Sequence, residues 1–213
     1  MIDVETLRRE YTQGSLDVAD LKPSPFDQFT VWFEQACSAK LQDPNAMSVA
    51  TVSAQGQPSL RTVLMKHYDQ DGFVFLTNYE SRKGREITEN PQVALMFPWL
   101  ALERQVIITG SASKISTSEA LKYFLKRPTD SQSSAWASPQ SRIVESRKAL
   151  QILWEGVKKK YADGKVPLPT FWGGYRVAPK TIEFWQGRTN RLHDRFLYTK
   201  QPDNSWALNR LGP

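Results

Sequence analysis

Three basic side chains alternate in the segment Arg191-Leu-His193-Asp-Arg195 near the end of the chain. Alternate residues of a strand share a face, so in a strand these side chains would lie together. Like charges on one face repel unless an anion or an electron-rich ring lies opposite, and Trp185 offers a flat surface nearby. The alternative is a solvated edge strand, because lysine and arginine commonly protect sheet edges. The segment is the most functional-looking local pattern in the sequence.

Two further cations, Arg82 and Lys83, fall at the start of a predicted helix that begins near Ser81. Positive charges there oppose the helix dipole and cost on the order of a few tenths of a kcal/mol. An anion would remove this cost, because N–H groups at a helix start together with arginine and lysine form a phosphate site. The competing interpretation is an ordinary exposed basic turn, and the local sequence leaves both open.

Phosphate oxygens could also be bound by Tyr123, Arg127 and Ser131, at the end of one predicted helix and in the segment behind it. Arg127 near a helix C-terminus is equally what the helix dipole favours, so this group also has a purely structural explanation. Arg61 and Lys66 share a predicted strand, where their odd spacing places them on opposite faces. They would then serve different ligand groups, unless a bulge brings them together.

Composition excludes several classes of site. A single cysteine, Cys37, permits no disulfide within the chain and no cysteine-rich metal site. Cys37 falls on an apolar helical stripe, which predicts a small buried hydrophobe rather than a catalytic thiol. The two histidines, His67 and His193, have no partners at metal-ligand spacing, so no metal site is indicated. The sequence also has no GxSxG, GxGxxG or GxxxxGK(S/T) motif.

The net charge of +6 suits anionic ligands, from phosphate esters to nucleic acid. The three-residue basic block Lys158 to Lys160 lies on a predicted helix and is interpreted as a solvated helix face rather than a nucleic-acid patch. The chain has no apolar run of about 18 residues, and its first residues are charged. A soluble, cytoplasmic protein is therefore expected.

The hydrophobic pattern predicts a mainly β chain. Residues 1–24 are polar, which predicts a mobile N-terminal arm with a short helix around Glu5 to Tyr11, and a single domain follows over residues 25–213. Helices are expected at 26–43, 81–90, 116–126 and 142–162, with a loop at 129–140. Strands are expected at 46–53, 59–68, 73–78, 93–99, 103–115, 170–179, 181–187, 193–200 and 205–211. Short antiparallel strands around one core indicate a small β-barrel with peripheral helices, rather than a doubly wound α/β sheet.

Six segments occur in an order and spacing that resemble one enzyme family. They are RTVLMKHYD, FLTNYESRKGREI, NPQVALMFPWLALERQV, KYFLKRPTDSQSSAWAS, VPLPTFWGGYRV and IEFWQGRTNRLHDRFLY. Together they are similar to pyridoxamine 5'-phosphate oxidases, from about Leu7 to the terminal Leu211-Gly-Pro. The resemblance implies an FMN-binding split β-barrel and a homodimer whose two active sites lie at the interface and are built from both chains.

The resemblance also implies a reaction. Pyridoxamine 5'-phosphate or pyridoxine 5'-phosphate is oxidised to pyridoxal 5'-phosphate by hydride transfer from substrate C4' to flavin N5. Oxygen then reoxidises the flavin and hydrogen peroxide is released, together with ammonia from the amine substrate. The flavin carries the redox chemistry, and the protein binds and orients.

Site residues are likewise implied by the resemblance. Arg82 and Lys83 would clamp the flavin phosphate, and Gln140 and Ser141 would be offered by the partner subunit. Arg191 and His193 would be catalytic, closing over the pyridine ring, under a mobile lid formed by Arg8 to Tyr11. The implied cofactor-binding residues are Arg61, Thr62, Val63, Leu64, Met65, Lys66, Leu76, Thr77, Arg82, Lys83, Gln105, Gln140, Ser141, Trp185 and Arg195. The implied substrate-binding residues are Arg8, Tyr11, Lys66, Tyr123, Arg127, Ser131, Arg191 and His193.

Three other functions agree with parts of the sequence. A phenazine-pathway oxidase of the same superfamily would share the FMN clamp but should lack part of the set Lys66, Tyr123, Arg127 and Ser131, and all four are present. A flavin or pyridoxal phosphate carrier without turnover would not need Arg191 and His193. A nucleic-acid module would show strong salt-dependent binding to DNA and no flavin.

Overall fold

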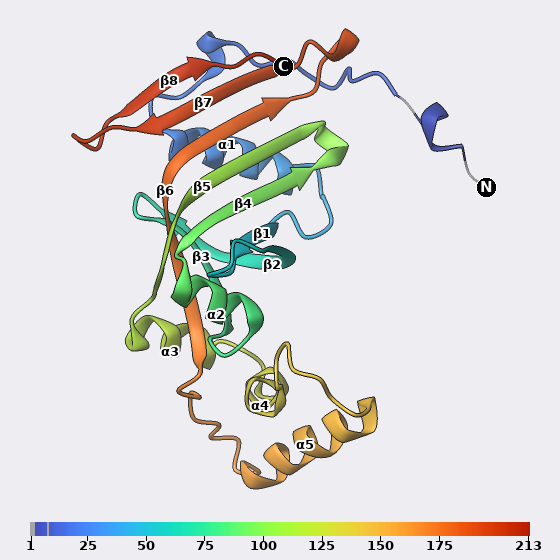
Figure 1. The fold of residues 1–213 in the computed structure, drawn as a ribbon, viewed down its shortest axis with the longest axis vertical. Coiled ribbons are helices and arrows are strands. Elements are labelled where there is room, and N and C mark those ends of the chain that lie inside the picture. The colour runs from blue at the N-terminus through green and yellow to red at the C-terminus, as the bar shows by residue number, and fades with distance from the viewer. Residues whose placement is uncertain (1–2, 8) are drawn as a thin grey trace. The chain divides into compact units, whose positions relative to one another are not determined.

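The computed structural model describes residues 3–7 and 9–213. This part of the chain contains eight strands and five α-helices, and Figure 1 shows their arrangement. The strands are β1 (Ala46–Val52), β2 (Pro58–Asp69), β3 (Gly72–Asn78), β4 (Gln92–Trp99), β5 (Arg104–Lys114), β6 (Trp172–Gln186), β7 (Asp194–Lys200) and β8 (Trp206–Arg210). The α-helices are α1 (Pro25–Ser38), α2 (Arg82–Glu89), α3 (Thr117–Leu125), α4 (Thr129–Ala137) and α5 (Arg147–Lys160). Single 3-10 turns cover Val4–Thr6, Val18–Asp20, Leu100–Leu102 and Thr189–Arg191.

The strands form one sheet in the order β3-β2-β1-β4-β5-β6-β7-β8. An additional antiparallel pairing of β3 with β6, from Phe73 opposite Val177 to Asn78 opposite Trp172, closes β1 to β6 into a barrel. β7 and β8 continue the sheet beyond β6 as antiparallel neighbours. The prediction of a mainly β split barrel with peripheral helices is confirmed.

The chain divides into two compact units. Unit 1 comprises residues 1–49, 94–110 and 179–213, and unit 2 comprises residues 50–93 and 111–178. The boundaries fall inside β1, β4, β5 and β6, so these strands contribute residues to both units. Each unit has its own buried residues and its own cavity.

The core of unit 1 is aromatic and is built on α1. The helix begins at Pro25 after the N-cap Ser24, whose Oγ accepts the Phe26 N–H at 3.3 Å. Phe29, fully buried, contacts Phe97 edge-on with ring centroids 5.0 Å apart. These contacts confirm that the predicted apolar stripe covers a core.

Two predictions about α1 are wrong. The helix ends at Ser38, before the expected stop at Asp43, because Lys40 and Asp43 both adopt positive φ. Cys37 is exposed rather than buried. The buried face follows Phe29, Trp32 and Ala36, and Cys37 lies one residue, or about 100°, further around the helix.

Unit 2 is organised around β3, which is buried along most of its length. α3 packs on it through the cluster of Val74, Ile115 and Ala120. α4 packs through a second cluster that contains Phe124, Ala135, Val166 and Trp172. These two clusters place the loop between α3 and α4 next to β3.

Several predicted boundaries were wrong. The expected loop 129–140 contains α4, the expected helix 142–162 is limited to 147–160, and the expected arm helix is only the turn Val4–Thr6. α5 starts late because Ser146 caps it, with its Oγ accepting the Ala149 N–H at 3.1 Å. The two strands expected at 170–187 are one strand, β6, which continues through Pro179.

Candidate active site

The larger cavity of unit 2, called here the cation cavity, has a volume of about 790 Å³. Among the described residues its lining contains five cations and no carboxylate. The cations are Arg61, Lys66, Lys83, Lys126 and Arg127. A neighbouring cavity of about 540 Å³ is lined by Arg61, Lys83 and Gln140 as well, and adds Arg82 and Ser141. This charge favours anions, and the volume is in the range of small-molecule sites.

Lys83 is a buried cation in the first turn of α2. Its ammonium donates to three neutral oxygens, Oγ1 of Thr77 at 3.0 Å, Oγ of Ser81 at 3.4 Å and Oε1 of Gln140 at 3.1 Å. Burial, reinforced by the nearby charge of Arg61, lowers the pKa of Lys83 from 10.5 to about 8. An anion bound here would relieve this desolvated charge. The helix-start cation predicted from sequence therefore lies at a site whose charge favours an anion.

Glu86, one turn further along α2, organises the other two cations. Its carboxylate accepts from Ser59 Oγ at 2.5 Å, from Arg82 Nε at 2.8 Å and from Arg61 Nη2 at 3.4 Å, and also from Thr51. Burial alone would raise its pKa, but these hydrogen bonds outweigh burial and lower the pKa to about 2. Glu86 is therefore ionised throughout the neutral range and orients both guanidinium groups.

Tyr123, Arg127 and Ser131 also line the cation cavity. The Arg127 guanidinium lies over the Trp172 ring, 4.9 Å from its centroid, and burial lowers the pKa of Arg127. Ser131 lies in the first turn of α4. Lys66 lines the same cavity from β2, at a register irregularity between Met65 and His67. Arg61 and Lys66, which the sequence left on opposite faces or joined by a bulge, thus line one cavity.

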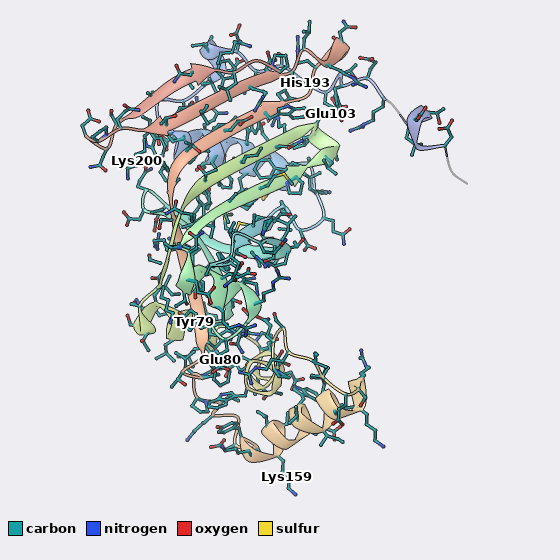
Figure 2. The ribbon with its side chains drawn as sticks, in the orientation of Figure 1. Tyr79, Glu80, Glu103, Lys159, His193 and Lys200 are labelled. Atoms are coloured by element: carbon teal, nitrogen blue, oxygen red, sulfur yellow. The ribbon has the colours of Figure 1, made fainter. Side chains whose placement is uncertain are left out.

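The cavity of unit 1, called here the aromatic cavity, has a volume of about 650 Å³. The Trp185 and His193 rings pack together with centroids 4.6 Å apart, and Tyr11 lies edge-on to both, at 5.8 and 5.6 Å. Gln105 and Arg191 are also in the lining. Figure 2 shows His193 and Glu103 at the same end of unit 1.

The hydrogen bond at His193 Nδ1 indicates the tautomer of the neutral ring. Its Nδ1 accepts the Arg188 backbone N–H at 3.1 Å. A neutral imidazole that accepts at Nδ1 carries its proton on Nε2, so Nε2 is the donor available to a ligand. Asn190 and Arg191 adopt positive φ in the turn before His193. The predicted strand face of three basic residues is therefore wrong, because β7 begins only at Asp194.

Two family models match the chain. Residues 33–161 match the model described as pyridoxamine 5'-phosphate oxidase, and residues 172–213 match the pyridoxine 5'-phosphate oxidase C-terminal dimerisation region. Similar curated proteins are named pyridoxine/pyridoxamine 5'-phosphate oxidase. Those of Rippkaea orientalis and Crocosphaera subtropica are 57% and 56% identical to this chain, with both chains fully covered. The chain belongs to the pyridoxine/pyridoxamine 5'-phosphate oxidase family.

Two solved structures are similar to this chain. PhzG from Burkholderia lata, in complex with tetrahydrophenazine-1-carboxylic acid, is 30% identical and has a TM-score of 0.87 over 94% of this chain and 100% of its own. A pyridoxamine 5'-phosphate oxidase-related, FMN binding protein from Nostoc punctiforme has a TM-score of 0.69 at 15% identity, over 91% of this chain and 100% of its own. The second likeness shows the split-barrel fold alone.

Most residues implied by the family resemblance line one of these cavities. The cation cavity and its neighbour contain Arg61, Thr62, Val63, Leu64, Lys66, Leu76, Thr77, Arg82, Lys83, Tyr123, Arg127, Ser131, Gln140 and Ser141. The aromatic cavity contains Tyr11, Gln105, Trp185, Arg191 and His193. Arg8 lies outside the described residues. Gln140 contacts Thr77 and Lys83 of its own chain, although the resemblance assigned it to the partner subunit.

Two implied residues lie outside these linings. Met65 is buried, and Arg195 donates to Oε1 of Glu183 at 2.8 Å and to the Gly212 carbonyl at 2.8 Å. The hydrogen bond with Glu183 raises the pKa of Arg195. Each side chain has a structural explanation in the described part of the chain.

Sequence reasoning missed Trp172 and Lys126 as lining residues, and it also missed the ion pairs of Arg176. Arg176 pairs with Asp69 of β2 and, at 3.2 Å, with Glu119 of α3, so it ties together the two elements that carry Lys66 and Tyr123. The FWGG motif contained a signal for Trp172, but no local pattern indicated the Arg176 bridge. Among the described residues, no group of three His, Cys, Asp or Glu side chains could hold a metal ion, and no helix is long and apolar enough to cross a membrane.

Proposed function

We propose that this chain is an FMN-dependent pyridoxal 5'-phosphate synthase that oxidises pyridoxamine 5'-phosphate and pyridoxine 5'-phosphate. Oxygen is the electron acceptor, and hydrogen peroxide is released, with ammonia from the amine substrate. The observation that carries the proposal is the cation cavity, in a chain 57% identical over its full length to a pyridoxine/pyridoxamine 5'-phosphate oxidase. FMN and the substrate each carry one phosphate, and five cations offset the four negative charges of two dianionic phosphates.

FMN fits the donors that the chain presents. Lys83 is a desolvated ammonium with neutral oxygen partners, and Arg82 lies beside it in the first turn of α2. In this proposal Lys83, Arg82 and Arg61 hold the flavin phosphate, with Thr62 to Lys66, Leu76 and Thr77 along the flavin. Gln105, Gln140, Ser141, Trp185 and Arg195 complete the flavin contacts. FMN, when bound, supplies the acceptor that takes hydride from substrate C4' at flavin N5 and is reoxidised by oxygen.

The substrate phosphate is held by Lys66, Tyr123, Arg127 and Ser131. Arg127 is fixed against Trp172, so it presents its N–H groups without much loss of side-chain freedom. Tyr123 and Ser131 add neutral donors, which select a phosphate oxygen by direction rather than by charge. A B6 vitamer without its phosphate would leave these donors and cations unpaired and would bind weakly.

Arg191 and His193 act on the pyridine ring. His193 Nε2–H donates to the ring or its hydroxyl, and Arg191 orients the substrate and polarises the C4' group. The arm at residues 8–11 acts as a lid. The match of residues 172–213 to a dimerisation region supports a homodimer, whose active sites draw on residues of both protomers. One free cysteine suits the reducing cytoplasm, the compartment proposed here.

The deciding experiment is anaerobic. The protein is reconstituted with FMN, pyridoxine 5'-phosphate is added, and the flavin absorbance is followed before and after air is admitted. Bleaching that reverses in air, with pyridoxal 5'-phosphate formed, is expected. Lys66→Ala and Arg191→Ala should each lose about tenfold or more in kcat/KM, whereas Lys122→Ala, an exposed lysine of α3, should not.

Other outcomes separate the alternatives. Flavin that binds but bleaches only with tetrahydrophenazine-1-carboxylic acid, the ligand in the PhzG complex, would favour oxidation of that class of compound, the second candidate. Flavin that stays oxidised with every substrate would indicate a carrier. Absence of flavin binding would contradict the proposal.

A further inference from the structure

Glu103 is a buried carboxylate that none of the roles above uses. It follows the turn Leu100–Leu102 between β4 and β5, adopts φ 54° and is only 3% exposed. A non-glycine residue with positive φ is uncommon, and an ionised side chain is rarely this buried unless it is paired. Its surroundings therefore have to supply compensating donors.

The compensating donors come from the N-terminal arm. Oε2 of Glu103 accepts the Gln13 backbone N–H at 2.9 Å, and Oε1 lies 3.7 Å from Nη1 of Arg9. Arg9 also donates to the Leu100 carbonyl at 3.1 Å. The arm segment 9–13 is thus fastened to Glu103 at both ends.

Between these two attachments lies Tyr11, which packs on Trp185 and His193. Tyr11 also contacts Gly187. The Gly187 N–H donates to the Glu103 carbonyl at 2.7 Å. A Cβ on Gly187 would lie 2.8 Å from Cγ of Tyr11 and 3.1 Å from Cβ of Glu103, so the three residues are in close contact. The Glu103 carbonyl thus holds the Gly187 backbone on which Tyr11 packs, and the Glu103 carboxylate holds the arm.

We infer that Glu103 is a positioning residue that fastens the arm as a wall of the aromatic cavity and keeps Tyr11 against His193. Glu103 itself does not line that cavity. Leu7, Arg9, Glu10 and Tyr11 do, so release of the arm would open the cavity on that side. The kinetic consequence rests on the proposed function, whereas the fastening does not.

The fastening is tested without substrate or FMN. In Glu103→Ala the Gln13 N–H loses its acceptor, so hydrogen exchange over residues 9–13 and tryptic cleavage after Arg9 should each become about tenfold faster. Glu103→Gln, which keeps one acceptor but not the charge, should be intermediate. Glu34→Ala, an exposed glutamate of α1, is the matched control and should behave as wild type. Unchanged exchange and cleavage in a folded Glu103→Ala protein would overturn the inference.

Gln13→Pro tests the fastening if Glu103→Ala does not fold. This substitution removes the backbone N–H that donates to Glu103 and leaves Glu103 in place. Faster cleavage after Arg9 in that variant supports the fastening, and wild-type cleavage overturns it. In the FMN-loaded enzyme we expect KM for pyridoxine 5'-phosphate to rise severalfold in Glu103→Ala with a smaller change in kcat. A wild type that oxidises no B6 phosphate would contradict the proposed function and leave the exchange result standing.

Discussion

Replacement of Lys83 by methionine should make the FMN-free protein more stable. Burial lowers the pKa of Lys83 from 10.5 to about 8, a difference that corresponds to about 3 kcal/mol. Between these pH values the unfolded chain binds a proton that the folded chain does not, so stability rises with pH from about 8 to 10.5. Below pH 8 the buried ammonium carries its full cost. Lys83→Met removes the charge while roughly keeping the volume, and should gain up to about 3 kcal/mol at pH 7.

The same substitution should weaken FMN binding. If the ammonium pairs with the flavin phosphate, the affinity depends on the protonated fraction of Lys83 in the free protein. That fraction falls from about 0.9 at pH 7 to about 0.1 at pH 9, so the Kd of FMN should rise about tenfold over this range. In Lys83→Met the affinity should be weaker at pH 7 and nearly independent of pH.

Denaturant unfolding of the FMN-free protein and flavin fluorescence titrations from pH 6.5 to 9 measure the two effects. The range stops below pH 9.5 so that ordinary lysines, with a pKa of about 10.4, stay charged. Lys122→Met is the control for loss of one positive charge at the surface. The reasoning is refuted if Lys83→Met destabilises the FMN-free protein, or if it retains the pH dependence of the wild-type Kd.

Two further predictions concern residues that hold the elements around the cation cavity in place. Arg176→Met leaves the carboxylates of Asp69 and Glu119 without their shared cation. This substitution should raise KM for pyridoxine 5'-phosphate about tenfold while FMN affinity stays constant. Equal losses of substrate affinity and FMN affinity would contradict a role confined to the substrate side. Gly84→Ala places a Cβ 2.0 Å from a backbone carbonyl oxygen in the loop before α2, and should cost about 3 kcal/mol in chemical denaturation. Gly156→Ala in α5, where nothing lies within 4 Å of the new Cβ, should be neutral or stabilising.

The parts of the site that depend on local chain geometry could be predicted from the sequence. Ser81 caps α2 with its Oγ 3.3 Å from the Gly84 N, so Arg82 and Lys83 occupy the first turn as expected. The strands that carry Arg61 and Thr77 were also recognisable, because turn signals such as Gln55-Gly56 and Asp71-Gly72 bound segments rich in apolar and β-branched residues. In each case a few consecutive residues contain the whole signal.

The parts that depend on tertiary contacts could not be predicted. Three of the nine residues of α4 are serines, which have modest helix propensity, and it lies in the Ser- and Gln-rich stretch 129–140 that resembled a loop. Its helix is stabilised by packing of Ala135 against Phe124 of the preceding helix and against Trp172, which comes from a distant part of the chain. The contact of Gln140 with Lys83 likewise joins residues far apart in sequence, and no periodicity records it.

The low pKa of Lys83 and the anion binding proposed for the cation cavity have one physical cause. A lining with five cations and, among the described residues, no carboxylate is unfavourable in the ligand-free chain, and Arg61 contributes directly to lowering the pKa of Lys83. Glu86 is close enough to pair with Arg61 and Arg82 but is not part of the lining, so it orients these groups without occupying the cavity. A carboxylate in the lining would stabilise the free protein but repel phosphate. The lining without a carboxylate therefore lowers folding stability and raises anion affinity. A stabilising effect of Lys83→Met, together with lost FMN affinity, would be the direct signature of that exchange.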